Sequence, residues 1–344
     1  MDMSRRSFLG GAVSVGCFAS VAGSSSTVGQ DVVLEPVRRT VVSGTFDVIV
    51  AGGGPAGTAA AVAAARAGAK TMLIESHGCL GGIWTSGLVG CMLDFDKGGL
   101  TGEIIARLDV LKARKREKRN NFHYEPEYMK LVCEDLCREA GVAVRLMTHV
   151  VAVESDPSGR SITAIITESK SGREAWRAKT FVDCTGDGDL AARAGCGFDL
   201  GITPDGFGQP ASLDALILFD DAEPLRKFFM HGGMPSPREA LAAEMKRAGI
   251  EPSYGIPTLY CVHPHMGVLM SNHEYKVRPD DAARISEATL NARREIIGQI
   301  EALAKLGGPW KNVRVAATAE QIGIRSARRI HGRYMVTREP QSVR

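Results

Sequence analysis

The sequence lacks the features that fix a chain by cross-links or metal ions. Its eight cysteines are scattered over 344 residues, too few for a disulfide framework. None has the Cys-x-x-Cys spacing of zinc or iron–sulfur sites, and Cys133 and Cys137 share one face of an expected helix as core candidates. His263, His265 and His273 are the alternative metal ligands, but two histidines separated by one proline rarely converge without a third ligand. We therefore expect no bound metal.

Long apolar runs and excess charge are also missing. Beyond the N-terminal segment, no stretch is apolar enough to cross a membrane. The 42 basic and 39 acidic residues give a net charge of +3, which does not suggest a polyanionic partner. The strongly basic run KARKREKR at 112–119 has no interleaved aromatic residues. We expect a soluble mature protein with no stable membrane span and no nucleic-acid partner.

The N-terminal segment has the organisation of an export signal. Arg5 and Arg6 precede an apolar stretch, Phe8–Ala22, that ends in small residues suited to cleavage. SRRSFL resembles a twin-arginine signal, a receptor-read bacterial address for proteins that are exported folded. An ordinary secretory signal is the alternative. We expect a signal peptide at 1–30 that is read by twin-arginine export machinery, a linker at 31–45, and a periplasmic or secreted mature protein.

Residues 46–75 have the pattern of a nucleotide-binding strand–helix–strand unit. A buried-strand run at 48–50 leads into GGGPAG at 52–57, an alanine-rich helix, and a second apolar strand that ends at Glu75. The first glycine permits a tight turn, the second lets backbone approach a pyrophosphate, and the third lets helix and strand pack closely. The helix N-terminus favours phosphates, and Glu75 is expected to accept hydrogen bonds from ribose hydroxyls. A merely structural turn is the alternative.

The residues after this unit favour FAD as the dinucleotide. Gly81 and Gly82 follow Glu75 closely, where flavoproteins with this entry motif let the chain pass near the pyrophosphate. Dehydrogenases that use NAD do not usually need glycines there. An NAD-dependent dehydrogenase stays open as the alternative, because it would share residues 46–75.

A second pattern lies between residues 142 and 189. Alternating apolar residues predict a strand followed by a β-meander, and DCTGDGD closes the region. Here the chain resembles FAD-dependent oxidoreductases related to fumarate reductase flavoproteins, with the glutathione-reductase-type FAD fold. The matching motifs are GGGPAG (52–57), IESHGCLGG (74–82), VDCTGDGDLAARAG (182–195), GQPASL (208–213) and IGIRSARRIHGRY (322–334). The resemblance runs from about Phe46 to Thr337.

The resemblance implies an α/β fold with a Rossmann-like FAD-binding domain at 46–200, including a three-stranded β-meander, and a smaller α+β substrate domain at 201–344. It also implies that the strand at 148–151 holds the adenine by its backbone and that the TGD segment borders the cofactor. A calcium loop, the alternative for TGDGD, lacks the extended ligand spacing. The expected cofactor contacts are Gly52, Gly54, Pro55, Ala56, Gly57, Glu75, Gly81, Gly82, Val151, Thr185, Gly186 and Asp187.

The resemblance implies an activity as well. An FAD-dependent oxidoreductase would remove a hydride from a small organic substrate and pass electrons to an unknown acceptor. Arg325, Arg328 and Arg329 would share one face if their segment were helical, and guanidinium groups suit a carboxylate-bearing substrate. Arg325 and Arg328 are the candidate catalytic residues, with a solvated arginine cluster as the alternative. Ser326 stands where the family usually has glutamate, so the role of that acid is open.

The C-terminal end departs from the family pattern. Relatives continue past IGIRSARRIHGRY into a return to the FAD domain, which helps to stabilise the reduced flavin. This sequence ends at Arg344. We therefore expect a truncated chain with weakened cofactor affinity, and a non-catalytic remnant of a flavoprotein is a further alternative.

Overall fold

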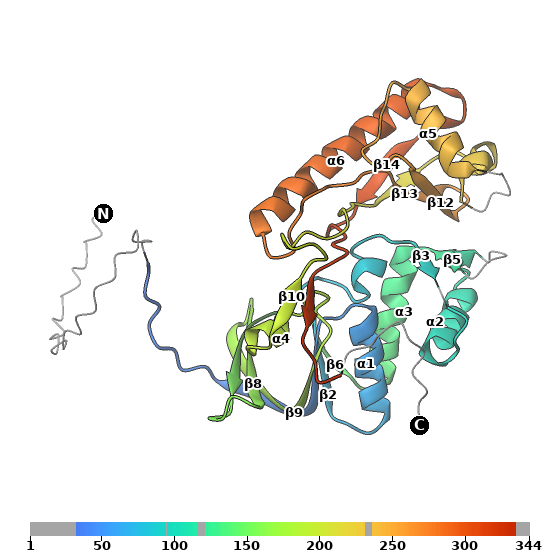
Figure 1. Ribbon diagram of the computed structural model, residues 1–344. Coiled ribbons are helices and arrows are strands. Elements are labelled where there is room, and N and C mark those ends of the chain that lie inside the picture. Colours follow the sequence, from blue (N-terminus) through green and yellow to red (C-terminus); the bar gives the residue numbers. More distant parts are fainter. Residues whose placement is uncertain (1–31, 94, 116–120, 231–235, 335–344) are drawn as a thin grey trace, which may run out of the picture. The chain divides into compact units, whose positions relative to one another are not determined.

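The computed structural model describes residues 32–93, 95–115, 121–230 and 236–334 (Figure 1). The chain divides into two compact units, Met1–Arg39 and Thr40–Arg344, which are treated separately. In the first unit, residues 32–39 form no helix or strand, and the expected twin-arginine segment lies outside the described residues. All helices and strands below belong to the second unit.

A six-stranded sheet forms the nucleotide-binding part of this unit, with the order β6-β2-β1-β9-β8-β7. The strands are β6 (Ala143–Arg145), β2 (Thr71–Ile74), β1 (Val42–Ala51), β9 (Gly172–Asp183), β8 (Ile162–Ser169) and β7 (His149–Ser155). β6, β2, β1 and β9 pair in parallel. β7, β8 and β9 form the antiparallel meander that the sequence predicts. β1 begins inside the segment expected to be a linker.

β9 connects the two halves of this sheet because it is 12 residues long. It pairs with β8 on one side and with β1 on the other, in a register that places Asp183 opposite Ala51. The carboxyl ends of β1 and β9 therefore meet at one edge, where open α/β sheets bind their ligands. The central position of β1 fits its apolar sequence, since Ile49 and Val50 are fully buried.

α1 (Pro55–Arg66) and α3 (Pro126–Glu139) pack against one face of this sheet, and α2 (Gly99–Val110) packs against α3. Figure 1 shows α1 and α3 side by side, and both contribute to one hydrophobic core with β1 and β2. Cys133 and Cys137 of α3 are fully buried in that core, as their spacing predicts. A small sheet contributes to the same core; its strands are β3 (Cys91–Leu93), β5 (Asn121–Tyr124) and β4 (Arg114–Lys115).

A second, antiparallel sheet has the order β12-β13-β11-β14. Its strands are β12 (Thr258–His263), β13 (Met266–Met270), β11 (Ala215–Leu218) and β14 (Arg314–Thr318). Helices α5 (Pro237–Arg247) and α6 (Ala282–Lys305) pack on one face of it. The short helices are α4 (Asp189–Arg193) and the 3₁₀ helices η1 (Gly82–Trp84), η2 (Glu223–Phe228) and η3 (Gly308–Trp310).

The apolar spacing of residues 286–306 predicts a long amphipathic helix with Ile296, Ile297, Ile300 and Leu303 on one stripe, and α6 is that helix. It begins earlier because Asp281 caps it, accepting the backbone N–H of Arg284. Ile296 and Ile300 lie on the buried stripe as predicted. Ile297 was predicted on the same stripe and is 42% exposed. One residue turns an α-helix by about 100°, which carries Ile297 to the solvent side.

The arginine-rich segment near the C-terminus is extended rather than helical. β15 (Arg328–Ile330) pairs antiparallel with β10 (Phe198–Leu200), so strand pairing decides the local structure. The prediction that Arg325, Arg328 and Arg329 share a helix face is therefore wrong. Arg325 lies before β15. Arg328 and Arg329 are the first two residues of β15, and their side chains point to opposite sides of the strand.

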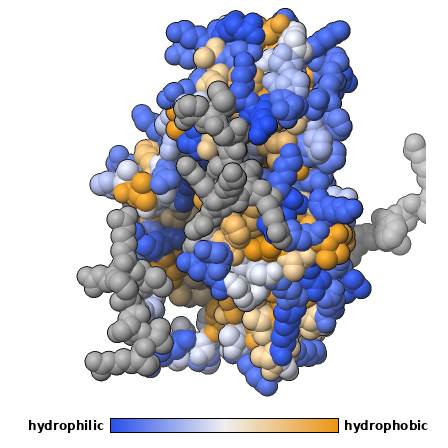
Figure 2. Space-filling model, turned by 90° about the vertical axis from the view of Figure 1, so that its right-hand side faces the viewer, coloured by the Kyte–Doolittle hydropathy of each residue, from blue (hydrophilic) through white to orange (hydrophobic). Residues whose placement is uncertain are grey.

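No helix among the described residues is long and apolar enough to span a membrane. No three His, Cys, Asp or Glu side chains among them gather closely enough to hold a metal ion. Figure 2 shows that hydrophilic side chains dominate the face turned to the viewer, with hydrophobic residues in smaller groups between them. The edge where β1 and β9 end is the expected location of a ligand-binding site.

Candidate functional site

The turn after β1 has a shape that requires glycine. Gly52 has φ +96°, and a methyl group there would overlap the carbonyl of Cys184, just past β9. A methyl group at Gly57 would overlap the carbonyl oxygen of Gly52, so α1 packs directly on the turn. A methyl group at Gly54 would meet nothing closer than the Cα of Gly82, at 4.0 Å. The turn is thus tight on its inner side and open on its outer side.

α1 presents its amino end to the same edge. Pro55 is its first residue, the N-cap Gly54 has no side chain to cap the helix, and no acidic residue lies in the first turn. The N–H groups of the first turn therefore keep their capacity to donate, and the positive end of the helix dipole lies at the edge. A helix start of this kind favours a phosphate group.

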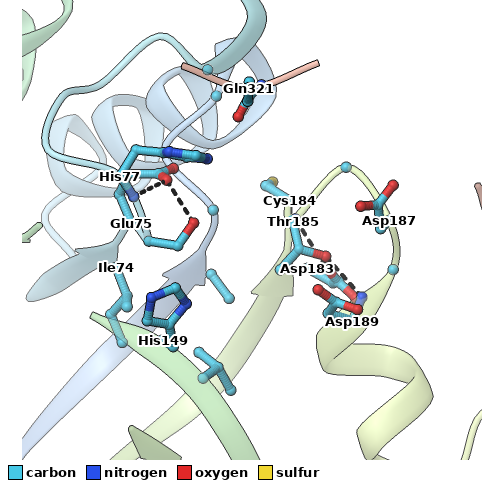
Figure 3. Close-up of a pocket in the computed structure, with 18 of the residues that line it drawn as sticks. Ile74, Glu75, His77, His149, Asp183, Cys184, Thr185, Asp187, Asp189 and Gln321 are labelled. Atoms are coloured by element: carbon cyan, nitrogen blue, oxygen red, sulfur yellow. Dashed lines mark hydrogen bonds between the residues drawn. The ribbon is translucent and has the colours of Figure 1, made fainter. Parts of the chain in front are cut away.

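Glu75, at the end of β2, ties the turn to the neighbouring loop. Its carboxylate is buried, with one oxygen accepting the N–H of Gly53 at 2.6 Å. The other oxygen accepts the N–H of His77 at 2.7 Å and the hydroxyl of Ser76 at 3.0 Å (Figure 3). A carboxylate has about four acceptor positions, so one remains for a ligand. That Glu75 accepts a ribose hydroxyl stays a prediction.

The loop after β9 is fixed by Asp183. One oxygen of its carboxylate accepts the backbone N–H of Thr185 at 3.0 Å and its hydroxyl at 2.7 Å. The other oxygen accepts the N–H of Ala191 at 2.8 Å. The Thr185 hydroxyl in turn accepts the N–H of Asp189 at 2.8 Å (Figure 3). Our sequence analysis missed this role of Asp183, although an Asp two residues before a Thr is a common signal for such a turn.

These elements border a cavity of about 1120 Å³. Figure 3 shows Glu75 and His77 on one side of it and Thr185 and Asp187 on the other. The predicted cofactor contacts that line it are Gly52, Gly54, Pro55, Ala56, Glu75, Gly82, Val151, Thr185, Gly186 and Asp187. The whole stretch 148–151, at the start of β7, lines it as well. One cavity therefore brings together four segments that are far apart in the sequence.

Gly57 and Gly81, also predicted as contacts, do not line the cavity. Gly57 supports the turn from below, as its close approach to Gly52 shows. Gly81 has φ +100°, and its N–H donates to the carbonyl of Gly53 at 2.8 Å. Both glycines shape the cavity without facing it.

The later half of the chain contributes lining residues that our sequence analysis missed. They are Ile285, Thr289, Glu320, Gln321, Ile322, Ile324 and Ile330. Ile285 and Thr289 belong to α6 and Ile330 to β15, while the stretch 320–324 is held by long-range pairing, in which the backbone of Gly323 bonds to that of Ser212. Ile322, Ile324 and Ile330 stand in the motif IGIRSARRIHGRY, but the motif indicates the family and not a place in the cavity, because only the fold brings these residues there.

Arg328 holds the cavity loop from outside. Its guanidinium donates to the backbone carbonyl of Asp187 at 2.9 Å and to the Asp189 carboxylate at 2.7 Å, and its side chain is only 18% exposed. Burial raises the pKa of Asp187 to about 6, with Asp189 and Asp183 adding to the rise and Arg328 opposing it. Arg328 does not line the cavity. Its hydrogen bonds assign it to positioning the loop rather than to binding a substrate.

Arg325 has a different environment. Its guanidinium donates to the carbonyl of Pro210, to the Ser212 hydroxyl at 3.0 Å, and toward the Met270 sulfur at 3.8 Å. Within the described residues, no carboxylate forms an ion pair with it. It follows the cavity-lining residue Ile324 directly. Arg325 is thus a cation beside the cavity that keeps its capacity to bind an anion.

Comparison with known proteins gives both a family and a fold. The profile of the family described as "FAD dependent oxidoreductase" matches residues 47–341. Dihydrolipoyl dehydrogenase of Trypanosoma brucei brucei is 33% identical over 91 residues, which are 22% of this chain and 19% of that enzyme. The chain thus matches only a small part of that curated relative.

Two solved structures show the same fold at low identity. A geranylgeranyl bacteriochlorophyll reductase-like protein from Thermoplasma acidophilum aligns with a TM-score of 0.51 at 16% identity, covering 81% of this chain and 66% of that one. The p-nitrophenol 4-monooxygenase PnpA from Pseudomonas putida DLL-E4 aligns with a TM-score of 0.50 at 14% identity, covering 84% and 69%. They support the predicted α/β fold with a Rossmann-like FAD-binding part.

Adding a methyl group at Gly57 tests whether the glycine turn forms part of the FAD site. We expect Gly57→Ala to weaken FAD binding by about 10- to 100-fold, because relieving a clash of this kind costs about 1–3 kcal/mol and deforms the phosphate-binding turn. The measurement is the dissociation constant of FAD from the apoprotein, followed by flavin fluorescence. Gly298→Ala in α6 is the control, since a methyl group there meets nothing within 4 Å. Equal affinities for the two variants would contradict the assignment.

Variants of Arg328 and its neighbour Arg329 test whether the Arg328 side chain positions the cavity loop. Arg328→Ala should weaken FAD binding about tenfold, because it removes charge-assisted hydrogen bonds to the cavity loop. Arg329→Ala is the matched control: Arg329 is 60% exposed and pairs with the exposed Asp199, so it should change affinity little. FAD titration calorimetry of both variants measures this. A larger loss for the Arg329 variant would refute the positioning role of Arg328.

Proposed function

Because the chain belongs to the FAD-dependent oxidoreductase family, we propose that it removes a hydride from a small carboxylate-bearing organic substrate and passes the electrons to a separate acceptor. Its cofactor is FAD, the dinucleotide that the glycine pair favoured. The family and the cofactor are findings. The substrate type, the direction of hydride transfer and the acceptor are parts of the proposal.

The residues of the cavity fit FAD. The outer side of the turn at Gly54 is open, while its inner side is closed by the packing at Gly52 and Gly57. The uncapped start of α1 supplies N–H donors for a diphosphate. Backbone at 148–151 is available to an adenine, and Glu75 keeps one acceptor position for a ribose. We propose that these groups hold the ADP half.

When bound, FAD supplies a two-electron acceptor for hydride. The chain's own residues hold the cavity loop and the substrate in position. Asp183 fixes the loop of Thr185 and Asp187 at one wall of the cavity, and Arg328 fixes it from outside. Arg325 follows the lining residue Ile324 directly and has no carboxylate partner among the described residues, so we propose that it binds a substrate carboxylate. The single observation that carries the proposal is the cavity bordered by the glycine turn and the TGD loop.

The test of this function is the flavin content and reactivity of the full-length protein. We expect a yellow protein with one FAD per chain, whose flavin is bleached without oxygen by at least one small carboxylic acid. Arg325→Gln should keep the FAD and raise the KM for that acid by about 10- to 100-fold, since a hydrogen bond to a charged group contributes about 1.5–3 kcal/mol. A protein that binds no FAD would refute the function and leave the non-catalytic remnant.

We also propose export of the folded, FAD-loaded protein through the twin-arginine route to the periplasm or beyond. The sequence SRRSFL before an apolar stretch supports it. Replacing both Arg5 and Arg6 by Lys should leave the protein in the cytoplasm of a bacterial host with its FAD bound. Cell fractionation measures this, and a double variant exported as well as the parent would contradict the proposal.

A further inference from the structure

The cavity that fits FAD is rich in acids. The carboxylates that line it belong to Glu75, Asp183, Asp187, Asp189 and Glu320. Among the described residues, Arg193 is the only lysine or arginine that lines it, and its guanidinium is already paired with the Asp189 carboxylate at 3.4 Å. The diphosphate of FAD brings further negative charge, and like charges in one cavity repel each other. The described lining is therefore short of positive charge, which a protonated histidine can supply.

Two histidines line the cavity, and one of them is fixed to the glycine turn. The Glu75 carboxylate accepts the N–H of His77 at 2.7 Å with one oxygen and the N–H of Gly53 at 2.6 Å with the other. The other histidine, His149, begins β7 on the expected adenine side. His77 is thus the histidine that a shared carboxylate holds to the diphosphate-binding turn (Figure 3).

Glu320 orients the ring of His77. Its carboxylate oxygen lies 3.3 Å from Nδ1 of the imidazole, and its backbone N–H donates to the carbonyl of Ser86 at 2.9 Å. A ring nitrogen beside a carboxylate is the one that carries the hydrogen. Within the described residues, the other nitrogen, Nε2, has no hydrogen-bond partner. One side of the ring is occupied, and the other is available to a ligand in the cavity.

Stability alone does not explain this pair. The His77 side chain is 28% exposed and that of Glu320 is 61% exposed. An ion pair in such contact with water contributes little to folding. Both residues nevertheless line the cavity, although they come from the loop after β2 and from the distant stretch 320–324. Their meeting place points to a ligand rather than to the fold.

We propose that His77 binds the diphosphate of FAD as an imidazolium, and that Glu320 is the positioning residue that holds its ring for this contact. The inference rests on the proposed placement of the ADP half and adds a cation and its partner to it. An imidazolium donates from both ring nitrogens, so Nδ1–H serves Glu320 and Nε2–H serves a phosphate oxygen. Charge-assisted hydrogen bonds of this kind are the strong ones.

The proposal implies that FAD binding takes up a proton. The charged and titratable groups around His77 are Glu75 of β2, Glu320, Lys130 of α3, His149 of β7 and, across the cavity, Asp187. The carboxylates favour the imidazolium, Lys130 opposes it, and a bound diphosphate adds to the favourable side. Water and buffer supply the proton. Because binding favours the protonated ring, FAD affinity should fall as pH rises.

The experiment is titration calorimetry of the full-length apoprotein with FAD at pH 8, in phosphate and in Tris, whose ionisation enthalpies differ. The wild type should take up about one proton per FAD. His77→Gln should remove this uptake and weaken the binding of FAD and of ADP by about 10- to 100-fold, since a charge-assisted hydrogen bond to the diphosphate is lost. His77→Lys keeps a positive charge at pH 8, so it should retain most of the affinity without the uptake.

A double-mutant cycle tests Glu320. Glu320→Ala should weaken FAD binding about 3- to 10-fold in the wild type and not at all in His77→Gln, where no imidazole is left to orient. A merely structural role in holding the stretch 320–324 would weaken both proteins alike. Thermal unfolding without ligand should be the same for all variants, because the exposed pair contributes little to stability.

The matched control is a second histidine–carboxylate pair. His331 lies 3.0 Å from Asp199, both side chains are about half exposed, and neither residue lines the cavity. His331→Gln and Asp199→Ala should leave the proton uptake and the affinities for FAD and ADP at their wild-type values.

The outcomes separate this inference from the proposed function. FAD binding without proton uptake, or with the same uptake in His77→Gln, would overturn the inference alone. Equal affinities of wild type and His77→Gln for ADP would also overturn it. Equal losses from Glu320→Ala in the two backgrounds would overturn the positioning role of Glu320. An apoprotein that binds no FAD would overturn both the inference and the proposed function.

Discussion

The parallel pairing of β1 with β9 is the interaction on which the site depends. Its register sets Ala51 beside Asp183, and the N–H of Cys184 donates to the carbonyl of Ala51 at 2.7 Å. The glycine turn and the TGD loop leave the sheet from these two adjacent strand ends. Any shift in register would separate the two walls of the cavity, because each step along a strand moves the chain by about 3.3 Å.

Two buried or half-buried carboxylates then hold these loops in shape. Glu75 accepts from the turn, and Asp183 accepts from the TGD loop. Each binds backbone N–H groups of its own chain, so the cavity does not depend on a ligand for its form. This arrangement lowers the ordering cost of binding, as expected of a preorganised site.

Local sequence patterns predicted those parts of the site whose conformation depends on residues close together in the sequence. The turn glycines, the helix start and the meander follow from short-range sterics and periodicity, and the structure has them where the sequence indicated. The helical face of Arg325 and Arg328 was wrong because strand pairing with β10, more than 100 residues away in sequence, decides that segment. The place of residues 321–324 in the cavity lining was missed for a similar reason, because their pairing with Ser212 is also long-range. The prediction that Ile297 is buried was wrong by one position around the helix, since Ile296 is buried and Ile297 is exposed.

The continuity of β9 has a mechanical consequence. One unbroken strand belongs to the meander at its beginning and to the parallel layer at its end, so the adenine side and the diphosphate side behave as a single stiff plate. β9 stands between β1 and β8 in the sheet order, so it is the strand through which the two sides of the cavity are joined. A proline or a bulge in the middle of β9 would therefore disturb the adenine side and the diphosphate side together.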